Sequence, residues 1–195
     1  MAGHKNFYLI AFLIFIMFSF DANEAPCETR QRYKRTIEKY IIPDVTLVNQ
    51  NRSKVKLRNL LDSDNPVMLD FIYGTCTTIC PVLSAGYSNL QKKLGAESGD
   101  VRLVSVSIDP EYDTPEVMKA YLKRYGAKPG WDFLTGTRED IDKVMRAFDA
   151  YVPNKMSHYP LTLLKAPRGD KWIRIYGLVG TAELMEEYRN MLKPR

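Results

Sequence analysis

The chain has 195 residues, of which 45% are hydrophobic and 26% are charged. This balance is typical of a globular domain with its own core, which needs no disulfide framework, so the three cysteines are free for chemistry. The net charge of +5 is modest and spread out, and no recognition motif accompanies it, so we expect no nucleic-acid partner.

An apolar N-terminal stretch is the first feature along the chain. Residues 7–20 carry no charge and follow Lys5. These 14 residues are fewer than the roughly 18 to 20 of a membrane-spanning helix, and they fit the apolar region of a secretory signal. We therefore expect residues 1–25 to be a signal peptide or a short membrane anchor. The basic cluster that follows favours cleavage, and the expected location is outside the cytoplasm, in a bacterium the periplasm, near the membrane.

A basic segment over residues 26–41 is expected to be a partly helical lead-in. It contains Cys27, which we interpret as an incidental or free thiol because no other ligand lies at metal-binding spacing. In residues 44–57, apolar residues alternate on both sides of a polar turn and predict a β-hairpin. Residues 66–74 form a nearly continuous apolar run, which predicts a buried strand.

The rest of the chain alternates between helical and strand patterns. Thr114, which precedes Pro115, and Thr137 are predicted to cap two of the helices. The predicted elements are helices over 80–95, 113–126, 137–151 and 181–192, a strand over 101–109, a short strand or loop over 131–136, and two strands within 160–177.

This order of elements predicts the fold class. Strands that alternate with helices imply a mostly parallel sheet with helices on both faces. Two final strands and a helix after that alternation indicate a thioredoxin-like core. We therefore expect one α/β domain over residues 42–195, with a thioredoxin-like fold, a central mixed sheet flanked by helices, and an N-terminal β-hairpin.

Cys76 and Cys80 lie where the first buried strand passes into a helix. Sites in open α/β sheets form at this end of the strands, and a helix N-terminus lowers the pKa of a thiol placed there. If both residues share the opening turn, their spacing brings them onto one face. Such a pair suits a structural disulfide, a redox couple or half of a metal site. Two buried apolar cysteines are the alternative, which export disfavours.

His158 is the one histidine beyond the predicted signal, and it precedes the strands of residues 160–177. In a thioredoxin-like sheet the first of these strands lies beside the cysteine-bearing strand, so the imidazole should face the thiols. Two cysteines and one histidine are incomplete for structural zinc, which has four protein ligands, but they suit copper. Met156 is a candidate for a soft extra ligand, although we expect it to serve packing.

Four motifs, FIYGTCTTICP, VSVSIDPEYDTPE, WDFLTG and HYPLTLL, occur in this order. They resemble the SCO/SenC family of thioredoxin-fold copper-binding proteins, which are linked to assembly of cytochrome c oxidase, and the resemblance extends over residues 42–192. It implies that Cys76, Cys80 and His158 bind one copper ion, as Cu(I) or Cu(II).

Two further positions bear on this resemblance. Asp109 matches a family Asp-Pro and is expected to support the site, although a plain turn residue before Pro110 fits equally. Gly74 departs from the family pattern, and we expect it to loosen the loop before the cysteines.

The resemblance implies an exported copper metallochaperone, whose partner is a copper-receiving or thiol-containing protein such as a cytochrome c oxidase subunit. The same cysteine pair also suits a thiol–disulfide oxidoreductase that reduces partner thiols or senses their redox state, so the motif leaves enzymatic activity open. A thiol peroxidase, indicated only by the spacing of Thr77 and Cys80, and a non-catalytic interaction module are the remaining alternatives.

Overall fold

The structure, a computed structural model, describes residues 33–193. The predicted signal peptide or anchor over residues 1–25, and Cys27, lie outside this range. Within it, no helix combines the length and the apolar character that crossing a membrane requires.

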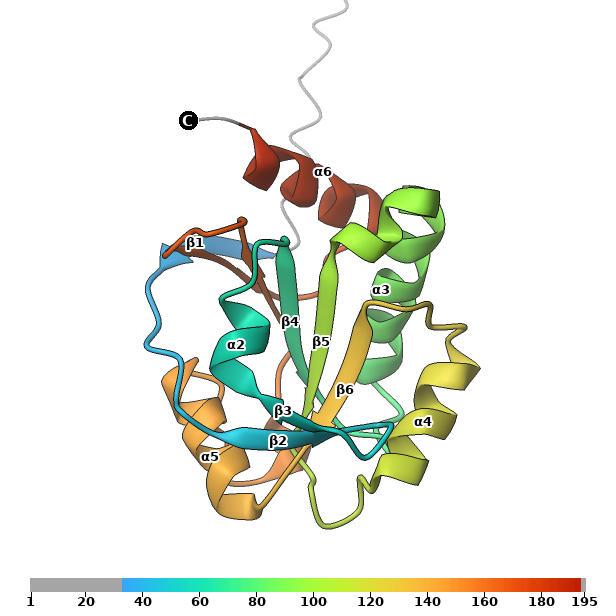
Figure 1. Cartoon of the computed structure of the whole chain (residues 1–195), viewed down its shortest axis with the longest axis vertical. Helices are drawn as coiled ribbons and strands as arrows, with labels where there is room; N and C mark the ends of the chain where they lie inside the picture. Colours follow the sequence, from blue (N-terminus) through green and yellow to red (C-terminus); the bar gives the residue numbers. More distant parts are fainter. Residues whose placement is uncertain (1–32, 194–195) are drawn as a thin grey trace, which may run out of the picture. The chain divides into compact units, whose positions relative to one another are not determined.

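One eight-stranded sheet has the order β1-β8-β7-β4-β5-β6-β2-β3 (Figure 1). Its strands are β1 (Lys34–Glu38), β2 (Thr46–Asn49), β3 (Lys54–Lys56), β4 (Val67–Ile72), β5 (Arg102–Ser107), β6 (Trp131–Thr135), β7 (Leu161–Lys165) and β8 (Trp172–Tyr176). β4, β5 and β6 run parallel, whereas the other neighbouring strands pair antiparallel. The sheet is mixed, as predicted, but the expectation of a mostly parallel sheet is wrong because β7, β8 and the β2–β3 hairpin pair antiparallel.

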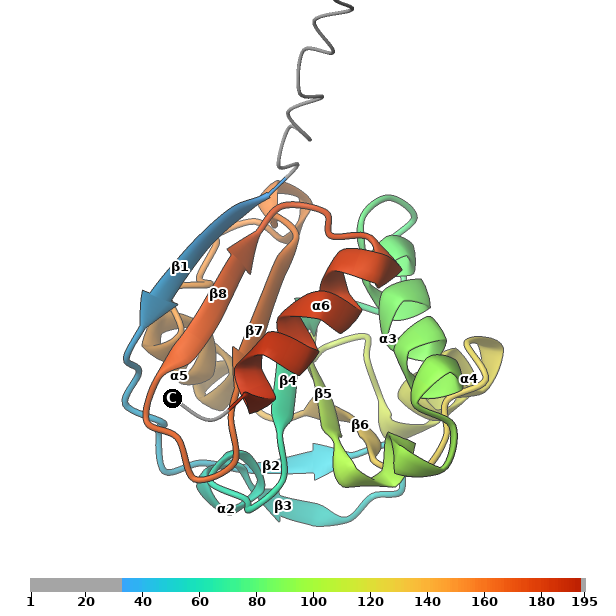
Figure 2. The same cartoon turned by 90° about the horizontal axis from the view of Figure 1, so that it is seen from above.

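Helices cover both faces of the sheet. α3 and α6 pack against each other on one face, and α5 lies on the other (Figure 2). Thr114 and Thr137 cap α4 and α5 as predicted, because their side chains accept hydrogen bonds from backbone N–H groups in the first turn. The helices are α2 (Leu57–Leu61), α3 (Cys80–Leu94), α4 (Pro115–Arg124), α5 (Arg138–Ala147) and α6 (Thr181–Leu192), with 3₁₀ turns η1 (Gly95–Asp100) and η2 (Lys155–Ser157).

The described part of the predicted lead-in is a strand, so the expectation of a partly helical segment is wrong there. β1 pairs antiparallel with β8, from Lys34 opposite Tyr176 to Glu38 opposite Trp172. β8 would otherwise present an unpaired backbone edge, and a segment that pairs with that edge gains hydrogen bonds which no local helical preference supplies. The sheet therefore begins before residue 42.

The two central strands β4 and β7 position the segments in which a site can form. Every residue of β4 and of β7 is buried, in keeping with the apolar runs in the sequence. The two strands are antiparallel neighbours, with Asp70 opposite Thr162. The end of β4 and the start of β7 therefore lie at the same edge of the sheet.

Candidate metal site

The loop after β4 and the turn before β7 bring the cysteines and the histidine together. Cys76 lies in the loop, where its N–H donates to the carbonyl of Tyr73, and Cys80 is the first residue of α3. The two cysteines therefore do not share one helical turn. Pro81 follows in the first turn of α3, which needs no amide donor there. His158 follows the η2 turn and precedes β7.

The three side chains converge on one point. The two sulfur atoms and one imidazole nitrogen all lie within 4.8 Å of one another. The Nε2 atom of His158 is 3.2 Å from Sγ of Cys80 and 3.8 Å from Sγ of Cys76. Both cysteines are free thiols, buried beneath the edge of the sheet, and the histidine is half-buried. The set that was predicted from distant parts of the sequence thus forms a cluster with the donors of a metal site.

His158 has its ligand nitrogen directed at the thiols. Its Nδ1 lies 2.7 Å from the carbonyl oxygen of Lys155, and because a carbonyl only accepts, Nδ1 carries the proton. Nε2 then presents its lone pair to the sulfur atoms. Burial lowers the pKa of His158, and the hydrogen bond to Lys155 only partly offsets it, so the imidazole stays neutral and able to bind a metal at pH 7.

The two thiols differ in acidity. Burial disfavours the Cys76 thiolate, but hydrogen bonds from the Cys80 thiol and from the amides of Cys80 and Thr78 outweigh burial and lower the pKa of Cys76 to about 7. Burial, followed by the hydrogen bond to Cys76, raises the pKa of Cys80. We predicted that the helix N-terminus lowers the thiol pKa values. The pKa of Cys76 is lowered, but the pKa of Cys80 is raised because burial has the larger effect there.

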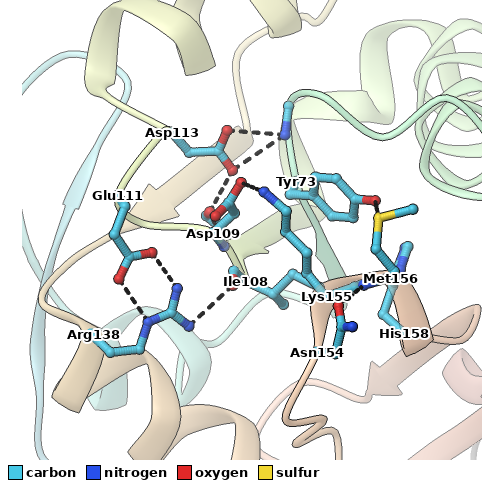
Figure 3. Close-up of polar contacts among 12 residues, drawn as sticks. Tyr73, Ile108, Asp109, Glu111, Asp113, Arg138, Asn154, Lys155, Met156 and His158 are labelled. Carbon is cyan, nitrogen blue, oxygen red and sulfur yellow. Dashed lines mark hydrogen bonds and ion pairs between the residues drawn. The ribbon is translucent and has the colours of Figure 1, made fainter.

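The cysteine loop is held down at Gly74. Its N–H donates to both carboxylate oxygens of Asp113, at 3.0 and 3.2 Å, and the Ser107 hydroxyl donates to the same carboxylate at 2.5 Å (Figure 3). A Cβ atom at Gly74 would lie only 2.7 Å from Oδ1 of Asp113. The expectation that Gly74 loosens the loop is therefore wrong, because the missing side chain allows this close approach. Asp113 went unnoticed in the sequence, where it reads as the entry to a helix.

Asp109 is linked to the cluster through Lys155. It is buried and outside the ligand group, and its carboxylate lies 2.5 Å from the ammonium nitrogen of Lys155 (Figure 3). Lys155 also supplies the carbonyl that orients His158. The ion pair thus fixes the η2 turn next to the imidazole. No local pattern marks Lys155 in the sequence, because its role depends on a residue 46 positions away.

Tyr73 packs against the histidine of the cluster. Its ring meets the ring of His158 edge-on, with centroids 5.0 Å apart. Its hydroxyl donates to Sδ of Met156 at 3.5 Å. Burial, and next the neighbouring Cys76, raise the pKa of Tyr73 to about 12, so the hydroxyl keeps its proton.

A thioredoxin-like α/β domain with two cysteines and a histidine at the ends of its central strands defines a class of thiol- and metal-handling proteins. The sequence model of the SCO1/SenC family matches residues 34–192, and the chain belongs to that family. The matched region begins at β1, the strand that joins the sheet ahead of the predicted domain.

The matches between this chain and its curated relatives cover only part of each relative. The SCO1 protein homolog of Bacillus subtilis is 39% identical over 116 residues, which are 58% of this chain and 59% of the relative. The chain spans about half to two thirds of the length of the first curated relatives that it matches.

Solved structures of the family share the fold. A SCO1/SenC family lipoprotein from Bacillus anthracis is 25% identical with a TM-score of 0.66, covering 80% of this chain and 97% of that chain. BsSco, described as a cytochrome c oxidase assembly protein with a disulfide switch, is 31% identical with a TM-score of 0.66, covering 80% and 95%. Bradyrhizobium japonicum ScoI with copper bound is 27% identical with a TM-score of 0.63, covering 78% and 99%.

Proposed function

We propose that the chain is an exported metallochaperone that binds one copper ion through Cys76, Cys80 and His158 and assists copper-site assembly in cytochrome c oxidase. The observation that carries the proposal is the convergence of two free thiols and an unprotonated imidazole nitrogen within 4.8 Å. It is supported by a relative that was solved with copper bound.

The donor set fits copper better than other common metals. Thiolates are soft ligands that suit Cu(I), and an imidazole extends the site to Cu(II). A structural zinc site has a fourth protein ligand, which the described cluster lacks. Three ligands at the edge of a sheet leave one side of the ion open, and a carrier needs that open side in order to pass its cargo to another protein.

Binding requires both thiols to lose their protons. Cys76 is partly ionised near pH 7, whereas burial opposes ionisation of Cys80. Copper supplies the positive charge that stabilises both thiolates, so uptake releases protons and is weaker in acid.

We further propose that the protein works outside the cytoplasm near a membrane. The apolar residues 7–20 support this location, as does a relative described as a lipoprotein. The partner in this proposal is a copper-receiving or thiol-containing subunit of cytochrome c oxidase, which agrees with the description of BsSco as an oxidase assembly protein.

A thiol–disulfide oxidoreductase is the second candidate function. The different acidities of the two thiols favour it, because an acidic thiol next to a buried one is the arrangement in which one cysteine attacks a partner disulfide and the other resolves the mixed disulfide. The disulfide switch named for BsSco supports the same candidate.

Copper titration of the reduced chain tests the first proposal. We expect one Cu(I) or one Cu(II) per chain, and we expect His158→Ala to weaken Cu(II) binding at least tenfold. An unchanged Cu(II) affinity in His158→Ala would refute the site.

Functional complementation separates the two candidates. A copper carrier should lose activity in Cys76→Ser, Cys80→Ser and His158→Ala alike. A thiol reductant should lose activity in the two cysteine variants alone, because reduction of a disulfide needs no imidazole ligand.

A further inference from the structure

We propose that Met156 is a further copper ligand of this chain, a thioether that replaces the imidazole of His158 on Cu(I) when the ion enters or leaves. This inference rests on the proposed copper-carrier function. In this proposal the copper ion enters and leaves the site past the exposed side chain of Met156.

Met156 is exposed, which packing does not explain. Its exposed fraction is 72%, and the expectation that it serves packing is therefore wrong. Among the residues that the structure describes, the other methionines are buried or half-buried, namely Met68, Met118, Met145, Met185 and Met191. Single exposed apolar side chains are common on protein surfaces, so exposure alone assigns no role, but it leaves this thioether free to move beside the cluster.

The backbone at Met156 is fixed by hydrogen bonds, although its side chain is largely exposed. The N–H of Met156 donates to the side chain of Asn154 at 2.9 Å, which caps the η2 turn. Lys155 ties the same turn to Asp109 by its side chain and to His158 by its carbonyl. Met156 therefore starts from a constant position, two residues from the imidazole.

The thioether is hydrogen-bonded to a residue that packs against His158, although the side chain as a whole is largely exposed. The Tyr73 hydroxyl donates to Sδ of Met156 at 3.5 Å, and the ring of the same tyrosine packs edge-on against His158 (Figure 3). Tyr73 thus contacts both the imidazole and the thioether. A hydrogen bond to a thioether is a weak contact, so the sulfur is held in place but can be released.

The replacement of His158 by Met156 on Cu(I) needs no other reactant. Thioethers are soft, neutral ligands that suit Cu(I), and methionine has three rotatable bonds with which to reach the ion. A bond forms between Cu(I) and Sδ of Met156 while the bond between Cu(I) and Nε2 of His158 breaks. Both donors are neutral, so copper stays Cu(I), no electron moves and no proton is needed.

Transfer kinetics test this route in the full chain. Cu(I) is loaded and then captured by the chelator bathocuproine, and the rate of capture is followed by absorbance. We expect Met156→Leu to slow capture about tenfold while the equilibrium affinity for Cu(I) changes less than twofold. Met191→Leu is the matched control, because it makes the same change in α6, next to the opposite end of β7, and should leave the rate unchanged.

A spectroscopic measurement detects the ligand itself. In His158→Ala the imidazole is absent, so Met156 should hold the loaded Cu(I). With selenomethionine in place of methionine, the selenium absorption edge should show a copper neighbour in His158→Ala and none in the double variant His158→Ala/Met156→Leu.

The outcomes separate this inference from the proposed function. If the parent chain takes up no stoichiometric Cu(I), the proposed function and this inference both fail. If the parent takes up Cu(I) but Met156→Leu releases it at the parent rate, or selenium has no copper neighbour in His158→Ala, this inference alone fails.

Discussion

Cys76 and Cys80 contact the same imidazole nitrogen, but the surroundings of the two thiols differ. Cys76 lies in a loop whose amide and thiol donors stabilise a thiolate, whereas Cys80 is itself fully buried at the start of α3, where water cannot stabilise a thiolate. The Cys76 thiol is therefore ready to bind a metal or attack a disulfide at neutral pH. The Cys80 thiol loses its proton only when a metal ion displaces it or when the leaving thiolate of a mixed disulfide accepts it. The two proposed functions, copper binding and disulfide exchange, would both depend on this difference in pKa between the thiols.

Alkylation should distinguish the two thiols. We expect iodoacetamide to modify Cys76 before Cys80 in the metal-free reduced chain, with a rate that rises with pH and has its midpoint near pH 7, because only the thiolate reacts. Peptide mapping by mass spectrometry gives both rates. Cys80→Ala removes the thiol donor and should move the midpoint for Cys76 upward. Equal modification of both cysteines at pH 7 would contradict the assigned acidities.

At the scale of elements, the cysteine loop depends on a glycine. Gly74→Ala places a Cβ atom 2.7 Å from Oδ1 of Asp113, so the loop or the carboxylate must move. We expect the free energy of unfolding to fall by about 1–3 kcal/mol in urea denaturation, with weaker copper binding.

Gly86→Ala is the control for that substitution. Gly86 lies within α3, and an added Cβ would find its nearest neighbour at an ordinary 3.7 Å. Alanine favours a helix over glycine by up to about 1 kcal/mol, so this variant should be as stable as the parent or more stable. If Gly74→Ala and Gly86→Ala have the same free energy of unfolding, the close approach of Asp113 to Gly74 does not contribute to stability.

The Asp109–Lys155 ion pair should respond unequally to loss of either partner. Lys155→Met leaves the Asp109 carboxylate, 5% exposed, without its cation, and should cost about 1–3 kcal/mol of unfolding free energy. Asp109→Asn leaves an ammonium group that is 33% exposed and hydrated, and should cost less than about 1 kcal/mol. The double variant should recover part of the loss that Lys155→Met causes.

Urea denaturation measures these losses, and Lys39→Met is the control. Lys39 pairs with Asp170 on the surface, where both side chains are exposed, so no loss is expected. Equal losses for the two single variants, adding up in the double variant, would show that burial of Asp109 does not govern the pair.

The elements show which features a sequence can predict. The hairpin, the buried strands and the caps at Thr114 and Thr137 follow from local patterns, so they were predicted. β1 was missed because it forms through pairing with β8, more than 130 residues later. Asp113 and Lys155 were missed for the same reason, since each acts on a residue that is distant in sequence. The three residues of the cluster were picked out because cysteine and histidine are rare in this chain, and the structure brings their side chains together.

At the scale of the whole molecule, a buried acid sets how stability varies with pH. Asp70 lies in β4 with both carboxylate oxygens buried and without a hydrogen-bond partner among the described residues. Burial raises the pKa of Asp70 from 3.8 to about 7. Between these values the unfolded chain loses the proton that the folded chain keeps, so unfolding becomes easier as pH rises.

Asp70→Asn should remove this dependence. We expect the variant to match the parent near pH 4 and to exceed its unfolding free energy by roughly 2–4 kcal/mol at pH 8, as measured by urea denaturation at both pH values. Asp100→Asn, an exposed substitution, should leave the pH profile of the parent in place. A parent whose stability does not fall between pH 4 and pH 8 would mean that Asp70 is not protonated in the fold.

The antiparallel pairing of β4 with β7 makes the stability of the fold depend on a bound ion. It joins ligands that are 78 and 82 residues apart in the chain. An ion held between them closes a long loop across the centre of the sheet, as a disulfide would, and binding to the folded form alone shifts the folding equilibrium. The metal-free chain then opens more often than the copper-bound chain, so limited proteolysis should cut the metal-free chain faster.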